Sequence, residues 1–221
     1  MQIIVDARFT DIANKHWGMK YEIIPSFCCE NLQSPVNSHP DMTITPVGDI
    51  FVCCPESYEY YRGFLGEKVQ KGKTSLSPHY PYDVAYNVLI YKDMAFSYTN
   101  ATDVVIKEEL KKQNIKLINV NQGYAKCSAC VCNEGIITAD ESIYRACCEY
   151  GIKTLKITPG NVNLPGYDYG FIGGASGNIG GVLSFFGDVS RHPDYLKIKE
   201  FCEFDYIADF PLTDIGTIFC I

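Results

Sequence analysis

Residues 41–52 read Asp-Met-Thr-Ile-Thr-Pro-Val-Gly-Asp-Ile-Phe-Val, two short apolar runs joined by a Gly-Asp turn. This pattern predicts a β-hairpin, because Gly and Asp adopt the backbone conformations that tight turns require. Three further segments repeat it, with Lys-Asp, Asn-Glu-Gly or Gly-Gly in the turn: residues 87–96, 128–138 and 176–184. Successive turns lie 44, 42 and 46 residues apart, so the sequence predicts an internal repeat.

Each predicted hairpin is followed by a Ser, Thr or Asp signal for a helix start and then by a helix-like stretch. These stretches are residues 57–65, 103–113, 141–150 and 188–204. A short strand is predicted after the better-defined helices, at residues 115–120, 152–158 and 206–210. The predicted unit is therefore strand, strand, helix, strand.

A fifth unit is split between the two ends of the sequence. Residues 3–6, 9–17 and 21–25 predict a strand, a helix and a strand, while residues 215–221 form an apolar strand with no hairpin partner. Pairing this last strand with residues 3–6 would close a ring and remove the exposed sheet edges. The predicted fold is a single α/β domain over residues 1–221, a five-fold pseudosymmetric α/β-propeller. An open α/β sheet with irregular crossovers matches the element count but does not explain the recurrence.

The composition excludes several classes of protein. Acidic residues exceed basic ones by 26 to 19, and the net charge of -7 argues against a nucleic-acid partner. No apolar run is long enough for a membrane span, and the first residues lack the features of a signal peptide. The eleven cysteines are an odd number, with adjacent pairs among apolar residues, which favours core thiols over a disulfide framework. We therefore expect a cytoplasmic protein.

In a ring of such units, the residues that lead into each hairpin converge near the central axis. Polar and reactive side chains are concentrated at these positions, where a purely structural layer would hold Val, Ile and Leu. Burying such groups without partners is unfavourable, so they require one another or a ligand. The axial segments are Asn37 to Asp41, Asp83 to Asn87, Lys126 to Ser128, Gly173 to Ser176, and Leu212 to Asp214.

The repeat, with both termini in one unit, resembles the pentein superfamily of guanidino-group-modifying α/β-propellers, which includes arginine deiminases, dimethylarginine and agmatine hydrolases, and amidinotransferases. His-Pro-Asp-Met at 39–42, Gly-Tyr-x-x-Cys-Ser at 123–128 and Gly-Gly-Ala-Ser-Gly at 173–177 most resemble an uncharacterised bacterial branch of this fold. The resemblance implies a thiolate that attacks a guanidinium carbon, an imidazole that shuttles protons, and carboxylates that bind the planar cation.

The sequence departs from the superfamily pattern at two places. The resemblance implies a cysteine in the last repeat and a histidine at the start of the fourth. Here the last repeat has Thr213-Asp214, and the fourth begins Phe171-Ile-Gly-Gly174. The superfamily nucleophile therefore has no counterpart at its own position, and a rearranged set of residues has to be considered.

The rearranged set takes one imidazole and one carboxylate from the first unit and a thiol from the third. We predict His39 as proton shuttle, Cys127 as nucleophile and Asp41 as a catalytic carboxylate, with Asp41 and Asp214 as cation ligands. The predicted substrate-binding residues are Asn37, Asn87, Lys126, Ser128, Ser176 and Asp214. The expected activity is that of a hydrolase or transferase acting on a C–N bond of a guanidino or other cationic, amino-acid-derived compound. Neither a cofactor nor a metal site is predicted, since Cys127-x-x-Cys130 lacks a second ligand pair.

Each candidate also has a structural alternative. His39 could fix a strand entry before Pro40, and Cys127 could belong to the core. The turn-rich, tyrosine-containing segment 159–169 is typical both of functional lids and of idle surface loops. The competing class of function is a non-catalytic propeller that binds a macromolecule, as the ribosome anti-association factor with this fold does.

Overall fold

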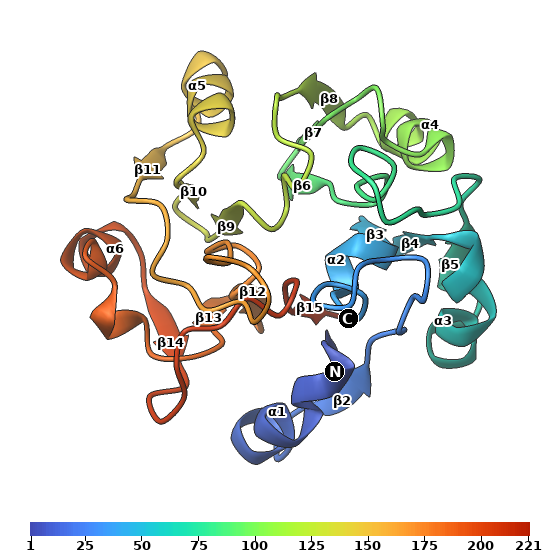
Figure 1. Ribbon diagram of the computed structural model, residues 1–221. Helices are drawn as coiled ribbons and strands as arrows, with labels where there is room; N and C mark the ends of the chain where they lie inside the picture. Colours follow the sequence, from blue (N-terminus) through green and yellow to red (C-terminus); the bar gives the residue numbers. More distant parts are fainter.

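The computed structural model describes all residues from 1 to 221, and its strands form five three-stranded sheets. In every sheet an inner strand pairs antiparallel with the middle strand, and the middle strand pairs parallel with the outer one. Figure 1 shows the five units around a common centre, with the inner strands nearest the centre and the longer helices at the outside. The predicted α/β class and strand, strand, helix, strand unit are thus present.

The four continuous units follow one another along the chain. The first has the short helix α2 (Pro40–Thr43), β3 (Ile44–Val47), β4 (Ile50–Cys53), α3 (Tyr58–Leu65) and β5 (Val69–Lys71). The second has β6 (Leu89–Tyr91), β7 (Met94–Ser97), α4 (Val104–Lys112) and β8 (Lys116–Asn119). The third has β9 (Ala129–Val131), β10 (Ile136–Thr138), α5 (Glu141–Glu149) and β11 (Thr154–Lys156). The fourth has β12 (Ser176–Ile179), β13 (Val182–Phe185), α6 (Tyr195–Phe201) and β14 (Phe204–Tyr206).

The fifth unit joins the two ends of the chain. It consists of β1 (Gln2–Val5), α1 (Thr10–Trp17), β2 (Glu22–Pro25) and β15 (Phe219–Cys220). Strand β15 pairs antiparallel with β1, with Ile3 opposite Cys220 and Ile4 opposite Phe219. The predicted pairing of the terminal strands is therefore confirmed, and the two chain ends lie side by side in Figure 1.

Four short 3₁₀ turns complete the backbone: η1 (Ala7–Phe9), η2 (Pro55–Ser57), η3 (Gly66–Lys68) and η4 (Val189–Arg191). The predicted helix at 188–204 is wrong in extent, because Pro193 follows η4 and the residue before a proline disfavours the helical conformation. The predicted strand start at residues 41–43 is also wrong. Pro40 occupies the first position of α2 instead, where a proline suits a helix.

The core is divided into five apolar clusters, each of which lies between two neighbouring units. One contains Val52 of the first unit and Leu110 of the second, and another contains Ile4 of the fifth unit and Phe51 of the first. Each unit is therefore stabilised by burying apolar surface against both neighbours, which a ring provides and an isolated unit does not.

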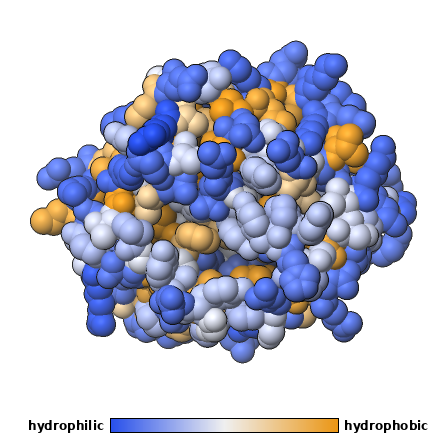
Figure 2. All heavy atoms as spheres, turned by 45° about the horizontal axis from the view of Figure 1, so that its top comes forward, coloured by the Kyte–Doolittle hydropathy of each residue, from blue (hydrophilic) through white to orange (hydrophobic).

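Polar side chains cover most of the face shown in Figure 2, and apolar side chains gather there only in small separate groups. All eleven cysteines are free thiols, nine of them at least partly buried. None of the helices combines the length and the apolar character of a membrane span.

Candidate functional site

A cavity of 340 Å³ lies over the axial segments of the first, third and fifth units. Three of its lining residues come from these axial segments and carry reactive groups: His39, Cys127 and Asp214. One ring nitrogen of His39, the Cys127 sulfur and one Asp214 oxygen all lie within 4.8 Å of one another. The structure thus brings together an imidazole, a thiol and a carboxylate that are distant in sequence.

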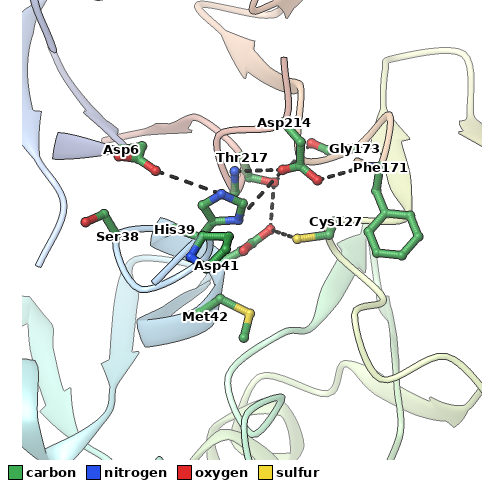
Figure 3. A network of polar contacts seen from close by, with 12 residues as sticks. Asp6, Ser38, His39, Asp41, Met42, Cys127, Phe171, Gly173, Asp214 and Thr217 are labelled. Atoms are coloured by element: carbon green, nitrogen blue, oxygen red, sulfur yellow. Dashed lines mark hydrogen bonds and ion pairs between the residues drawn. The ribbon is translucent and has the colours of Figure 1, made fainter. Parts of the chain in front are cut away.

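The thiol of Cys127 is held by two neighbours. It donates a hydrogen bond to Oδ2 of Asp41 at 2.7 Å, as Figure 3 shows, and the Asn87 amide donates to the sulfur at 3.6 Å. Oδ1 of Asn87 also accepts from the backbone amides of Lys126 and Cys127. Burial raises the pKa of Cys127 well above its ordinary value, and the charges of Asp41 and Asp214 raise it further. The resting group is therefore a thiol whose proton points at Asp41.

His39 lies between two carboxylates (Figure 3). Its Nδ1 is 3.8 Å from Asp214 Oδ1, and its Nε2 is 3.9 Å from Asp6 Oδ2, both beyond hydrogen-bonding distance. Nε2 is buried and has no hydrogen-bond partner. Burial lowers the pKa of His39, while Asp214 and Asp6 oppose this effect. A neutral imidazole with a free nitrogen can accept a proton from a nearby group.

Asp214 is fixed by the backbone around it. Its Oδ2 accepts from the Phe171 amide at 2.8 Å, and its Oδ1 accepts from the Gly216 amide at 2.9 Å. Burial raises the pKa of Asp214, and His39 and the backbone hydrogen bonds oppose this. The carboxylate lies where a Cβ of Gly174 would be, so a side chain at position 174 would displace it.

A side chain at position 216 would likewise collide with His39. The φ of Gly216, +66°, lies in the left-handed region, and a Cβ at this position would overlap the Cβ and ring of His39. The amide of Asp41 also donates to the Gly216 carbonyl at 3.1 Å. The loop that precedes β15 therefore contacts the backbone and the imidazole of the first unit directly.

Asp41 has a different place from the one predicted. It is fully buried beneath Cys127 and is not one of the residues that line the cavity. Thr217 lies 3.1 Å from Asp41 Oδ2 and accepts from Lys126 Nζ at 3.0 Å. Burial raises the pKa of Asp41, which the Cys127 hydrogen bond and the Lys126 charge oppose. Burial likewise lowers the pKa of Lys126, against the effect of Asp41.

The other predicted binding residues are dispersed. Lys126 lines a separate cavity of 200 Å³ beside Val88 and Phe219, and Ser128 lines another of 200 Å³ beside Asp140. Ser176 is buried and donates to Cys130 and to the Gly173 carbonyl. Asn37 is absent from the lining of the main cavity, where only Asp214 of the predicted binding set is found. The reason is local, since side chains of successive residues at a strand entry point in different directions.

Sequence reasoning missed the aromatic wall of the cavity. Tyr124 and Phe171 lie with ring centroids 6.1 Å apart, and Tyr124 donates to Asp83 at 2.6 Å. Tyr167 and Tyr169, both about half exposed, come from the turn-rich segment 159–169. The tyrosines of that segment were the signal in the sequence that could have indicated this wall. Their position over the cavity depends on how the loop folds back onto the axial segments.

Two features could hold a positively charged group in or beside the cavity. Asp214 and Asp168 are carboxylates in its lining, and the aromatic faces of Tyr124, Tyr167 and Phe171 favour cations. The set His39, Cys127 and Asp214 also has the donor types that a zinc ion accepts.

Comparisons with known proteins address the fold and the family. The model of a family described as "Family of unknown function (DUF6873)" matches residues 4–219. The chain belongs to this family. No curated protein matches the sequence.

Three solved structures have the same fold. A cysteine-to-serine variant of DDAH from Pseudomonas aeruginosa in complex with citrulline has a TM-score of 0.58 at 9% identity, covering 94% of this chain and 91% of its own. A histidine-to-glycine variant of dimethylarginine dimethylaminohydrolase, as an adduct with S-methyl-L-thiocitrulline, has the same TM-score and identity and covers 94% and 92%. An adduct of that enzyme with 4-chloro-2-hydroxymethylpyridine has a TM-score of 0.57 at 9% identity and covers 94% and 91%. The resemblance to the pentein superfamily is confirmed at the level of fold.

The burial of His39 predicts an acid-sensitive contribution to stability. Its folded pKa lies below the ordinary value of about 6.5, so the unfolded chain binds more protons between these two values. Stability should rise with pH through this window and be lost as pH falls below about 6.5, with a slope of at most about 1.4 kcal/mol per pH unit. Urea unfolding between about pH 5 and 7 measures it, and His39→Gln should remove this part of the slope.

The matched control is His79→Gln, because His79 is exposed. It should leave the pH dependence of the free energy of unfolding unchanged. Equal slopes in the wild type and in His39→Gln would show that the imidazole is not buried in its neutral form.

Proposed function

We propose that this protein is a small-molecule enzyme that acts on a C–N bond of a guanidino or related cationic compound. The observation that carries the proposal is the convergence of Cys127, His39 and Asp214 within 4.8 Å at an aromatic-walled cavity of 340 Å³. The dimethylarginine dimethylaminohydrolase fold supports the same reaction class. In this interpretation the five sheets are the blades of a closed propeller, and the cavity lies at one end of its axis.

Asp214 binds the planar cation in this proposal. Its carboxylate is already oriented by the amides of Phe171 and Gly216, so little ordering is needed when a ligand arrives. The rings of Tyr124 and Phe171 provide apolar and cation–π contacts to the alkyl and charged parts of the ligand.

Cys127 and Asp41 begin the chemical step. The thiol proton moves to Asp41 Oδ2, to which it is already hydrogen-bonded, as the sulfur attacks the guanidinium carbon and a C–S bond forms. The raised pKa of Asp41 suits it to accept this proton. Asp41 is then a base beneath the nucleophile rather than a ligand of the cation.

His39 completes the step by proton transfer. The neutral imidazole accepts a proton from a nitrogen of the tetrahedral adduct and passes it to the leaving nitrogen while the C–N bond breaks, and the amine departs. The neutral imidazole then takes a proton from a water molecule that attacks the same carbon, the C–S bond breaks, and a ureido product is released. Asp41 returns its proton to the sulfur, and His39 releases its proton to solvent, where the free amine takes it up. Atoms and charges therefore balance over the cycle.

A thermal-shift screen with arginine, agmatine and methylated arginines tests the binding part of the proposal. A ligand that binds only the folded state should raise Tm, and Asp214→Asn should weaken its binding by at least tenfold, because a charged hydrogen bond contributes about 1.5–3 kcal/mol. Asp49→Asn, at the exposed β3–β4 turn, is the matched control and should bind like the wild type. Release of an amine or a ureido product from the same compounds tests turnover.

The alternative of a non-catalytic propeller has one observation in its favour. The groups beneath the cavity bond largely to one another, through Lys126, Thr217, Asp41 and Cys127. The absence of a shift with every cation, together with unchanged behaviour of Asp214→Asn, would favour this class and defeat the enzyme proposal.

A further inference from the structure

A second group of metal-ligating side chains lies outside the cavity, where the third and fourth units meet. Cys132 and Glu134 belong to the β9–β10 turn, and Cys202 directly follows α6. The sulfur atoms of the two cysteines and one carboxylate oxygen of Glu134 all lie within 4.8 Å of one another. The two thiols are buried in the apolar cluster between these units, while Glu134 is exposed.

From this geometry we propose that Cys132, Glu134 and Cys202 bind one Zn²⁺ ion or a similar thiophilic divalent ion. Zinc takes thiolates at about 2.3 Å and carboxylates at about 2.1 Å in a tetrahedron, which separates its ligand atoms by roughly 3.5–3.8 Å. Side chains already within 4.8 Å of one another need only small rotations to reach this spacing. A water molecule completes the four ligands on the exposed side, where Glu134 lies.

The turn fixes the position of the Cys132 sulfur. The Cys132 thiol donates a hydrogen bond to the Gly135 carbonyl at 3.3 Å, and its sulfur lies beside Cys202 and Glu134. Binding the ion releases the two thiol protons, so affinity should increase with pH. The ion would link the third unit to the fourth across their shared apolar cluster.

A comparison within the chain separates this cluster from ordinary core thiols. Cys29 and Cys54 also form a buried pair whose thiols are hydrogen-bonded, but no third ligand atom completes a set with them. Cys54 hydrogen-bonds to Ser57 instead. Unlike Cys29 and Cys54, the pair Cys132 and Cys202 has the exposed carboxylate of Glu134 close enough to act as a third metal ligand.

The test is a titration of the reduced, chelator-treated full chain with Co²⁺, followed by displacement with Zn²⁺. We expect one equivalent of Co²⁺ to produce a thiolate-to-cobalt charge-transfer band, and Zn²⁺ to remove that band and raise Tm by a few degrees. Glu134→Gln should weaken binding at least tenfold without disturbing the fold, because Glu134 is exposed. Cys132→Ser and Cys202→Ser should each reduce the band.

Two control variants distinguish a metal site at Cys132, Glu134 and Cys202 from a metal site at the cavity. Glu203→Gln removes the same charge from the exposed residue next to Cys202 and should bind like the wild type. Cys127→Ser breaks the set at the cavity and should keep the band. Loss of the band in Cys127→Ser with full binding in Glu134→Gln would overturn the proposal, as would the absence of any charge-transfer band or a Cys132–Cys202 disulfide in freshly prepared protein.

Discussion

Replacing Cys127 by serine is expected to reduce turnover of a guanidino substrate by a factor on the order of 10³ or more, while ligand affinity changes only a few-fold. A hydroxyl in this place keeps the shape of the site and the hydrogen bond to Asp41 but is a far weaker nucleophile. Single-turnover kinetics and a binding titration measure the two effects separately.

The matched control is Cys130→Ser, the same substitution three residues along the chain. Cys130 is buried, hydrogen-bonds with Ser176 and the Ile172 carbonyl, and does not line the cavity. Its variant should retain turnover. If Cys127→Ser retains it as well, Cys127 is a core thiol and the covalent mechanism is wrong.

Deleting residues 216–221 is expected to abolish cooperative folding. The deletion removes β15, which pairs with β1, and the buried side chains of Ile218 and Phe219. Each such side chain contributes about 1.5–3 kcal/mol by burial, against a total stability of about 5–15 kcal/mol for a domain. The deletion also exposes one edge of β1 and two apolar clusters, so the loss exceeds that of the two side chains.

Urea unfolding followed by circular dichroism measures this effect. Phe219→Ala alone should cost about 3–5 kcal/mol and keep a cooperative transition at a lower midpoint. Val182→Ala, an exposed position in β13, is the control and should change stability by less than about 0.5 kcal/mol. A truncated chain that unfolds at the same midpoint as the intact one would show that ring closure is dispensable.

The repeat could be predicted from sequence because each unit carries its own local signals. Turn residues such as Gly48-Asp49 fix the hairpins, and Asp103 and Asp140 accept hydrogen bonds from the first turns of α4 and α5. Strand β5 was missed because Val69–Lys71 is only three residues long and has no alternation of its own. Its pairing with β4 supplies the stabilisation that its sequence does not indicate.

The candidate site could be predicted only in part. The equivalent places of His39, Cys127 and Asp214 in the repeat indicated that their side chains would lie close together. The sequence did not indicate which neighbouring side chains would line the cavity. The direction in which each side chain points depends on the backbone rotation at the strand entry. Asp6, which accepts hydrogen bonds from Arg8 and lies beside His39, comes from the end of a strand that reads as purely structural.

The contact between Gly216 and His39 has a consequence for how this family can diverge. The space that a side chain at position 216 would need is filled by the imidazole, and the backbone there is left-handed. Among related chains, a residue larger than glycine at position 216 should therefore be inherited only together with a smaller residue at position 39. Related chains that lack the imidazole would be free to vary at both positions, so a larger residue at position 216 would identify chains without a histidine at position 39.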